Sequence, residues 1–414
     1  MGKTNKTRTD QKVITALICL APLFSNYGFG LFLLPEIPLM LALMYGVISS
    51  KRYHWSKAII LFGCFLMFSA FMGIVAPKLN STFDVGQFFS TFARLTFYFL
   101  CIVFLSARFF NLTTAIKVCS SVSIVNSAYL IIQSIAYTFF SRLLPWYFSF
   151  LPIKQNSKLI EDPDYYIKNF GYRPSGLFFE PEQFALYVVP TILFVLFFTS
   201  KEYTPKLKTL SIILMCVAVI LSGSGTGLGL LAYIIVMYII KSIKTHGKKN
   251  AFQKIMPVVV IIGCIAGVFL FSGYLLDSLD RLTNTDEMSS FAVRVLRGIS
   301  AYKQYPIINK IFGVGYGNYD VFNAANGIST IYDFGESLYV NAFMFMTTGT
   351  GVFGSLLYLA SNYTLIRKSH GVFRYRAIMF FVALFLTTEA LTMSIIMIYG
   401  FILSSNKYYE RERL

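Results

Sequence analysis

A short segment of the sequence, RPSGLFFEPEQ, carries one arginine and two glutamates immediately before a long apolar run. The charged residues are Arg173, Glu180 and Glu182, and the run that follows is typical of a membrane span. Charged groups at membrane depth are costly, so they are candidates for function. A guanidinium binds phosphate through paired hydrogen bonds, and a carboxylate can act as a base toward a hydroxyl. The segment could therefore bind a phosphorylated substrate and act on it.

The charged residues of this segment also have structural interpretations. Pro181 suits the first turn of the following helix, because its missing N–H costs nothing there. Glu180 would then lie at the N-terminal edge of that helix, where the helix dipole favours a carboxylate. Arg173 could contact lipid phosphates at the membrane surface. We favour a functional role for Arg173, and we give the two interpretations of Glu180 equal weight.

A second group of charged residues lies between positions 276 and 336. Arg294 and Arg297 are three residues apart, so they share one face if residues 287–304 are helical. Glu336 opens a late apolar span, where it either caps the helix or faces the same cavity as the first group. This second segment therefore adds arginines and a carboxylate of the same kind as the first.

Two glycine-rich stretches, at 222–229 and 313–319, indicate close packing rather than a nucleotide site. Gly313, Gly315 and Gly317 alternate in GVGYGNY, which lacks the GxxxxGK[ST] and GxGxxG spacings of nucleotide-binding loops. They predict a tight connection near the membrane surface. The small residues of SGSGTGLG, at 222–229, predict a turn and a close contact between helices.

The composition indicates a polytopic membrane protein. The 414 residues are 56% hydrophobic and 13% charged, with a mean hydropathy of +0.63, whereas a soluble protein of this length carries far more charge. Apolar runs extend from end to end, so we predict one membrane domain over residues 1–414, beginning with an uncleaved helix. The six cysteines fall in apolar runs and the three histidines lack metal-ligand spacing. We predict no structural disulfide, no metal and no cofactor.

We expect an all-α fold with about twelve transmembrane helices. The predicted spans are 13–27, 29–49, 57–76, 87–106, 113–139, 183–200, 209–223, 225–241, 255–275, 337–362 and 377–404, the last divided in two near Thr387–Thr392. Basic residues concentrate in alternate loops, which marks those loops as cytoplasmic and explains the net charge of +17 without nucleic acid. The basic C-terminal tail favours an even number of spans and cytoplasmic termini; eleven spans are the alternative. The opposite face then carries two long loops, 140–182 and 276–336, which we predict to be ordered and functional.

Outward-facing arginines and carboxylates suit sugar transfer from a lipid pyrophosphate. The leaving lipid diphosphate develops negative charge, which guanidinium groups can bind in a bidentate manner. The accepting sugar hydroxyl needs a base, or at least an acceptor oriented toward it.

At these same residues the sequence resembles the Wzy-type O-antigen polymerase family, which is related to the O-antigen ligases. GYRPSGLFFEPEQFA matches the pattern Arg-x-x-Gly-x-Phe-x-Glu-Pro that precedes a span. SSFAVRVLRGISAYKQYPIINKIFGVGYGNY matches a later Ser-x-x-x-Arg stretch followed by alternating glycines. ESLYVNAFMFMTTGTGVFG matches a third block that opens a late span. By motif the resemblance covers about residues 170–362.

The resemblance implies a metal-independent glycosyltransferase with a GT-C-like membrane fold in the bacterial inner membrane, its active site facing the periplasm. Its substrates would be undecaprenyl-pyrophosphate-linked oligosaccharides, with membrane lipids and a chain-length regulator protein as further partners and no nucleic acid. The catalytic candidates are Arg173, Glu180 and Arg294, which match the family motifs, and Glu336, which opens the third block. The candidates for substrate binding are Arg173, Arg281, Arg294, Arg297, Tyr172 and Tyr316.

Two departures from the family pattern leave alternatives open. The turn at SGSGTG lacks the arginine that related proteins carry, and Glu336 stands where the ligases place a histidine. The second departure favours a polymerase over a ligase, and it leaves the base open between Glu336, Glu180 and none. A transporter for lipid-linked sugars is a further alternative, but charges inside the spans are few. Of these, Arg94 should pair or line a cavity, and Glu36 lies between two prolines.

Overall fold

The computed structural model describes residues 9–30, 32–49, 55–80, 82–154, 167, 172–197, 205–241, 292–330 and 340–412. The chain divides into two compact units, each described by itself. Unit 1 comprises Met1–Ala21, Glu36–Ala115 and Asn284–Leu414, and unit 2 comprises Pro22–Pro35 and Ile116–Thr283. The single membrane domain that the sequence predicts over residues 1–414 stays a prediction.

The described residues of unit 1 are almost entirely helical. Its α-helices are α1 (Thr9–Leu20), α2 (Glu36–Ser49), α3 (Lys57–Leu79), α4 (Val85–Cys101), α5 (Ala107–Phe109), α13 (Arg297–Gln304), α14 (Ile307–Phe312), α15 (Tyr319–Ala325), α16 (Ala342–Lys368), α17 (Gly371–Leu386) and α18 (Ser394–Glu412). Two π-helical turns, Ile102–Ser106 and Ala292–Leu296, and a 3-10 turn, Glu389–Leu391, interrupt them.

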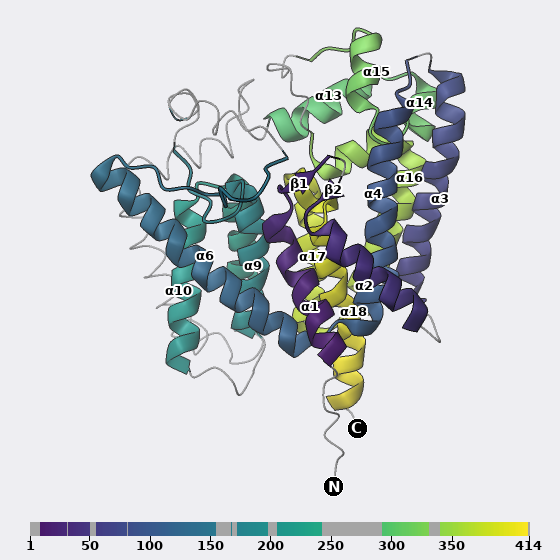
Figure 1. Cartoon of the computed structure of the whole chain (residues 1–414). Coiled ribbons are helices and arrows are strands. Elements are labelled where there is room, and N and C mark those ends of the chain that lie inside the picture. The colour runs from purple at the N-terminus through teal and green to yellow at the C-terminus, as the bar shows by residue number, and fades with distance from the viewer. Residues whose placement is uncertain are drawn as a thin grey trace. The chain divides into compact units, whose positions relative to one another are not determined.

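Unit 2 combines helices with a small hairpin. Its helices are α6 (Leu112–Phe140, of which Ile116 onward belongs to this unit), α9 (Pro181–Phe197), α10 (Pro205–Leu221) and Gly225–Lys241. The strands β1 (Gly28–Phe29) and β2 (Phe32–Leu33) pair antiparallel, and a 3-10 turn, Ala21–Phe24, leads into them. α9 and α10 pack on each other (Figure 1).

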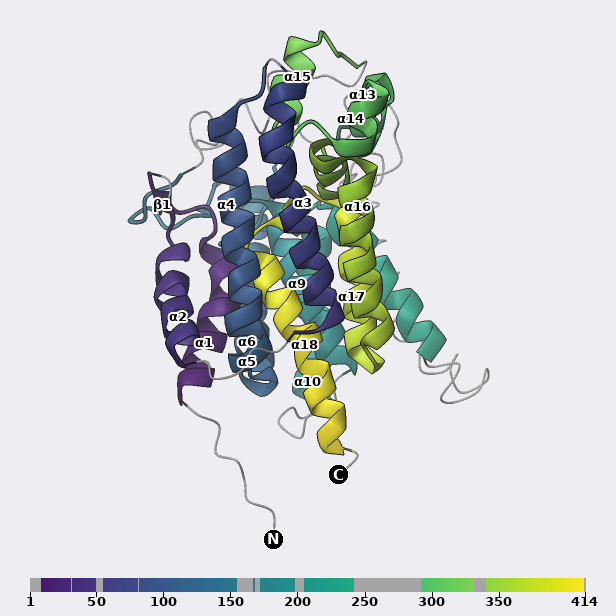
Figure 2. The ribbon, with the colours of Figure 1, turned by 90° about the vertical axis from the view of Figure 1, so that its right-hand side faces the viewer.

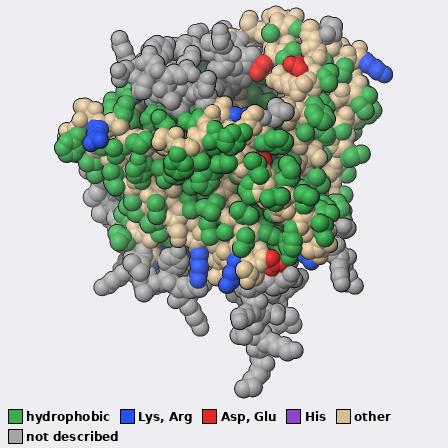
Figure 3. Space-filling model, in the orientation of Figure 1, with side chains coloured by type: hydrophobic (Ala, Val, Ile, Leu, Met, Phe, Trp, Pro, Cys, Tyr) green, Lys and Arg blue, Asp and Glu red, His purple; other side chains and the backbone are tan. Residues whose placement is uncertain are grey.

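Four helical segments are long and apolar enough to cross a membrane. They are Lys57–Leu79, Val85–Phe109, Leu112–Phe140 and Ala342–Lys368. Large apolar side chains remain exposed on several helices, among them Ile48 of α2 and Phe139 of α6, and Figure 3 shows hydrophobic side chains gathered over these helices. The described residues are therefore mostly helical and include helices able to cross a membrane, as expected of the helical membrane protein that the sequence predicts. The number of spans, the membrane and the orientation stay predictions.

The side chains of the loops fix where several helices begin. Ser56 accepts a hydrogen bond from the backbone N–H of Ile59 at the start of α3, and Asn341 accepts one from Met344 at the start of α16. Such N-caps satisfy backbone donors that have no partner within the helix. The predicted break of the last apolar stretch is confirmed, because α17 ends at Leu386 and α18 begins at Ser394.

The predicted second span, 29–49, is wrong over its first residues. Residues 28–33 form the hairpin, and Gly30 in its turn has φ +54, which glycine adopts without strain. The helix begins only at Glu36, after Pro35. Because GFGLFLL is apolar throughout, its pattern does not separate a strand from a buried helix.

In unit 1 the long helices form one packed group. α16 contacts α3 and α17, α3 contacts α4, and α17 contacts α18, so these helices lie side by side in Figure 2. The short helices α13, α14 and α15 gather at one end of the group, where α3 joins α4. This end carries the described residues of the second motif segment (289–319 in the sequence) and the start of α16, which belongs to the third motif segment (336–354).

Candidate functional site

The first motif segment, GYRPSGLFFEPEQFA (171–185 in the sequence), is hydrogen-bonded to α6 within unit 2. Gln133 accepts a hydrogen bond from the backbone N–H of Gly176 at 2.9 Å and donates to the carbonyl oxygen of Gly176 at 3.0 Å. Asn126 accepts one from the N–H of Leu177 at 2.9 Å. Beyond these contacts, the ring of Phe178 is buried and packs on Tyr187. The segment is therefore an ordered loop.

Arg173 lies in this loop beside a stacked aromatic pair. The ring of Tyr172 stacks on Tyr137 of α6 with ring centres 4.1 Å apart, and the two residues that follow Arg173, Pro174 and Ser175, are buried. The Arg173 side chain is half-buried. Tyr172, a candidate for binding substrate, is itself largely covered by this packing.

The two glutamates at the start of α9 differ in burial. The helix begins at Pro181, and the Glu180 carbonyl accepts the backbone N–H of Phe184, so Glu180 occupies the N-terminal edge expected from its structural interpretation. Its side chain is exposed. Glu182, in the first turn, is only 3% exposed. Of the two carboxylates that the sequence places here, Glu182 is therefore the one removed from water.

The second motif segment lies in unit 1, at the π-helical turn that leads into α13. Arg294 is half-buried, and its carbonyl oxygen accepts the N–H of Asn341, which links the segment to the start of α16. Arg297 is fully buried. A Cβ added to Gly298 would lie 2.8 Å from the Met344 side chain, so the first turn of α13 packs closely on α16.

The positive charge of Arg297 acts on the carboxylate of Asp320 in α15. Burial raises the pKa of Asp320 above its ordinary value of 3.8, and the positive charge of Arg297 partly opposes that rise. The cost of removing the carboxylate from water therefore exceeds what the nearby cation recovers. Packing joins the two helices, since Ala301 of α13 and Tyr319 of α15 belong to one buried cluster.

The raised pKa of Asp320 predicts a pH dependence of stability. A carboxyl whose pKa is higher in the folded protein binds protons more tightly when folded, so the free energy of unfolding falls as pH rises through the interval from 3.8 to the raised value. Asp320→Asn lacks the titrating carboxyl and therefore lacks this pH dependence. As pH rises through the interval, we expect the free energy of unfolding of the wild type to fall relative to that of the variant. The measurement is the unfolding midpoint of both proteins between about pH 3 and pH 7. A difference that is constant with pH would contradict this.

The alternating glycines of GVGYGNY, at the end of the second motif segment, connect that segment to the third. The N–H groups of Val314 and Gly315 donate to the carbonyl oxygens of Thr348 and Gly349 in α16, both at 2.9 Å. α16 can offer these acceptors because its backbone leaves helical geometry at Gly351, with φ 65 and ψ −172. The predicted tight connection is therefore a strap of backbone hydrogen bonds across a kinked helix.

The side chains around this strap form a core. Tyr316, a predicted substrate-binding residue, is buried with its ring edge-on to Phe65 and Phe345. Asn318 donates to the carbonyl oxygen of Asp84 and accepts that residue's N–H, so the strap also holds the turn between α3 and α4. Tyr316 contributes packing in this arrangement.

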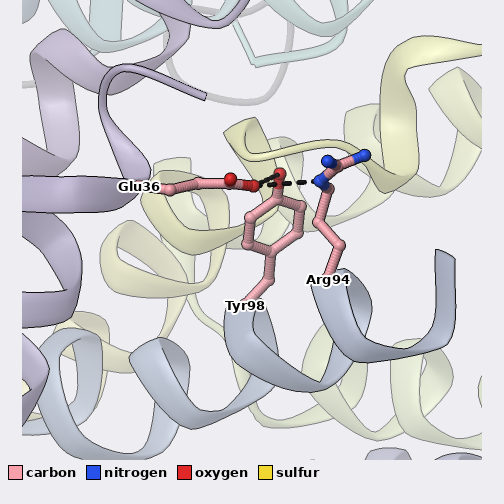
Figure 4. Close-up of polar contacts among 3 residues, drawn as sticks. All are labelled: Glu36, Arg94 and Tyr98. Carbon is pink, nitrogen blue, oxygen red and sulfur yellow. Dashed lines mark hydrogen bonds and ion pairs between the residues drawn. The ribbon is translucent and has the colours of Figure 1, made fainter. Parts of the chain in front are cut away.

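Two of the charges predicted inside the spans, Glu36 and Arg94, pair with each other in unit 1. Figure 4 shows Arg94 and Tyr98, both on α4, directed at Glu36 at the start of α2. Arg94 Nε lies 3.0 Å from Glu36 Oε1, and the Tyr98 hydroxyl donates to the same oxygen at 3.1 Å. The prediction that Arg94 should pair is confirmed. Burying an ion pair is tolerable only when both charges are compensated in this way.

Breaking this pair on one side should cost more than removing both charges. Arg94→Met would remove the cation beside a carboxylate whose side chain is 7% exposed, whereas the arginine side chain is 35% exposed and partly solvated. We expect a loss of about 2 kcal/mol, below the 3–5 kcal/mol typical of fully buried pairs. Glu36→Gln with Arg94→Met should recover part of it, read from thermal unfolding in detergent. Additive losses in the double variant would contradict the pairing.

The predicted site residues therefore fall into two groups. Arg173, Glu180 and Tyr172 belong to unit 2, and Arg294, Arg297 and Tyr316 belong to unit 1. Arg281 and Glu336 lie outside the described residues. Convergence of the two groups on one substrate stays a prediction. In the part of the chain that the structure describes, no three His, Cys, Asp or Glu side chains could together hold a metal ion.

The residues that sequence reasoning missed are the buried amides of α6. Asn126 and Gln133 lie in an apolar run that the sequence predicts as a plain span, and they are 2% and 0% exposed. Their signal was available, because amide side chains within a membrane helix need hydrogen-bond partners and seldom face lipid.

No family model, no curated protein and no solved structure matches the chain.

Proposed function

We propose that the protein is a glycosyltransferase that polymerises lipid-linked oligosaccharide repeat units. The donor is the growing glycan on undecaprenyl pyrophosphate, and the acceptor is a sugar hydroxyl of an incoming repeat unit on the same carrier. The reaction would take place at the outer face of a bacterial inner membrane. A glycan of the O-antigen or capsule type would be the product.

The observation that carries this proposal is the ordered loop holding Arg173 at the start of α9. The loop is bound to α6 by Gln133 and Asn126 after Arg173 and by the stacking of Tyr172 on Tyr137 before it, and Arg173 itself is half-buried. A guanidinium held in this way is preorganised, so less conformational freedom is lost when it binds a diphosphate. Arg294 is likewise half-buried on a segment tied to α16.

The proposed reaction needs charge stabilisation more than covalent chemistry. The acceptor hydroxyl oxygen forms a bond to the anomeric carbon of the donor sugar while the bond from that carbon to the diphosphate oxygen breaks. Arg173 and Arg294, supported by Arg281 and Arg297, stabilise the charge on the departing lipid diphosphate. The hydroxyl proton passes to a carboxylate, Glu180 or Glu336, or to water if no strict base is used.

The test is elongation by the purified protein. With synthetic lipid-linked repeat units as the only substrate, and with no ion gradient, a polymerase should give a ladder of products. A ligase that moves finished glycan to another acceptor gives no ladder from repeat units alone, and a transporter gives none because it forms no glycosidic bond. Absence of a ladder with repeat units of several compositions would overturn the proposal.

One observation argues against the transporter. A charged transport path would need charged groups free to meet the substrate along the spans, and the two that the sequence singles out there, Glu36 and Arg94, are instead bound to each other, with Tyr98 as a further partner of Glu36.

A further inference from the structure

α6 presents buried polar groups to the first motif segment. Asn126, Gln133 and Tyr137 are separated by seven and four residues, so they lie on one face of the helix. Both amides are almost completely buried. An amide removed from water is costly unless its hydrogen bonds are made, so these side chains are committed to the groups that they contact.

Gln133 binds both backbone polar groups of one glycine. Its Oε1 accepts the Gly176 N–H at 2.9 Å, and its Nε2 donates to the carbonyl oxygens of Gly176 at 3.0 Å and Pro145 at 3.1 Å. Gly176 has φ +68, and an added Cβ would lie 3.0 Å from the carbonyl oxygen of Asn126. The loop backbone therefore lies directly against α6, in a conformation that favours glycine.

These contacts lie on the C-terminal side of Arg173, and a second anchor lies on the other side. Tyr172 stacks on Tyr137, which is one helical turn from Gln133. Pro174 fixes its own φ and restricts the residue before it to extended conformations. The backbone at Arg173 is thus held from both sides by one face of α6.

We propose that Gln133 is a positioning residue for Arg173: it holds the loop so that the guanidinium meets the diphosphate of the lipid-linked donor. This inference rests on the proposed function for its activity readout but not for its structural readout. Gln133 touches no substrate and acts through the loop. A misplacement of about 1 Å can cost about 100-fold in rate, so loss of Gln133 should slow elongation by at least about tenfold.

The experiment uses the full chain, purified in detergent, as wild type, Gln133→Leu and the control Thr138→Ala, whose side chain is exposed on α6. Hydrogen exchange of the amides at Gly176 and Leu177 should accelerate in Gln133→Leu and stay unchanged in Thr138→Ala. Gln133→Glu keeps an acceptor for the Gly176 N–H, so it should give intermediate exchange. It also serves if the leucine variant does not fold.

The activity arm is a double-variant cycle with synthetic lipid-linked repeat units. If Gln133 acts through Arg173, Gln133→Leu added to Arg173→Ala should slow elongation no further than Arg173→Ala alone. Unchanged amide exchange in both Gln133 variants would overturn the proposal, as would faster exchange with a normal elongation rate or independent effects in the cycle. A wild-type protein that elongates nothing would reject the proposed function instead, and the exchange result would still decide whether Gln133 holds the loop.

Discussion

Arg173→Ala and Arg294→Ala should each reduce elongation of lipid-linked repeat units by about 100-fold or more. A leaving diphosphate develops negative charge, and removing one preorganised donor from such a charge typically costs a factor of about 10²–10³. Both arginines are half-buried, so their charges act where water screens them less than at an open surface. Arg173→Lys should keep part of the rate, because it keeps the charge but loses the planar, bidentate geometry.

The measurement is the rate of ladder formation by purified protein, with product length in cells as a second readout. Arg142→Ala is the matched control, since Arg142 lies in the same predicted outer loop with an exposed side chain. It should elongate at the wild-type rate. If Arg173→Ala and Arg294→Ala both make products of normal length at normal rates, the two arginines do not serve the diphosphate and the site assignment is wrong.

The sequence predicts the helical membrane class because long apolar runs leave few other ways to satisfy the backbone. It also predicts the break between α17 and α18, which the structure confirms, and a partner for Arg94, since a charge at that depth must be compensated. It could not name Glu36 as that partner. The pairing depends on how α2 packs beside α4, and no local pattern encodes it.

Other features were hidden because different structures share one local pattern. The hairpin at 28–33 has the same apolar composition as the helix after it. The π-helical turn carrying Arg294 is not signalled by residue type, and it depends on the packing around it. The amides of α6 look like ordinary interruptions of an apolar run until the loop that they bind, 51 residues away for Asn126 and Leu177, lies against them.

The alternating glycines of GVGYG show how much a short pattern can determine once its neighbours are known. Gly313 has φ 86 and ψ 178, a conformation almost restricted to glycine. An added Cβ would meet the backbone of Gly349 and would lie 2.6 Å from the backbone nitrogen of Gly351. Neither obstacle is a flexible side chain, so the strap cannot yield without moving α16.

Gly313→Ala should therefore be among the most destabilising single substitutions in unit 1. Backbone strain of about 1–3 kcal/mol and overpacking of about 1–3 kcal/mol together predict a loss of about 3–5 kcal/mol. Gly327→Ala is the control: its φ is also positive, +60, but nothing lies within 4 Å of the added Cβ. That variant carries only the backbone cost of about 1–2 kcal/mol. Thermal unfolding followed by circular dichroism in detergent should separate the two, and equal midpoints would show that the strap does not bear on α16 as the structure indicates.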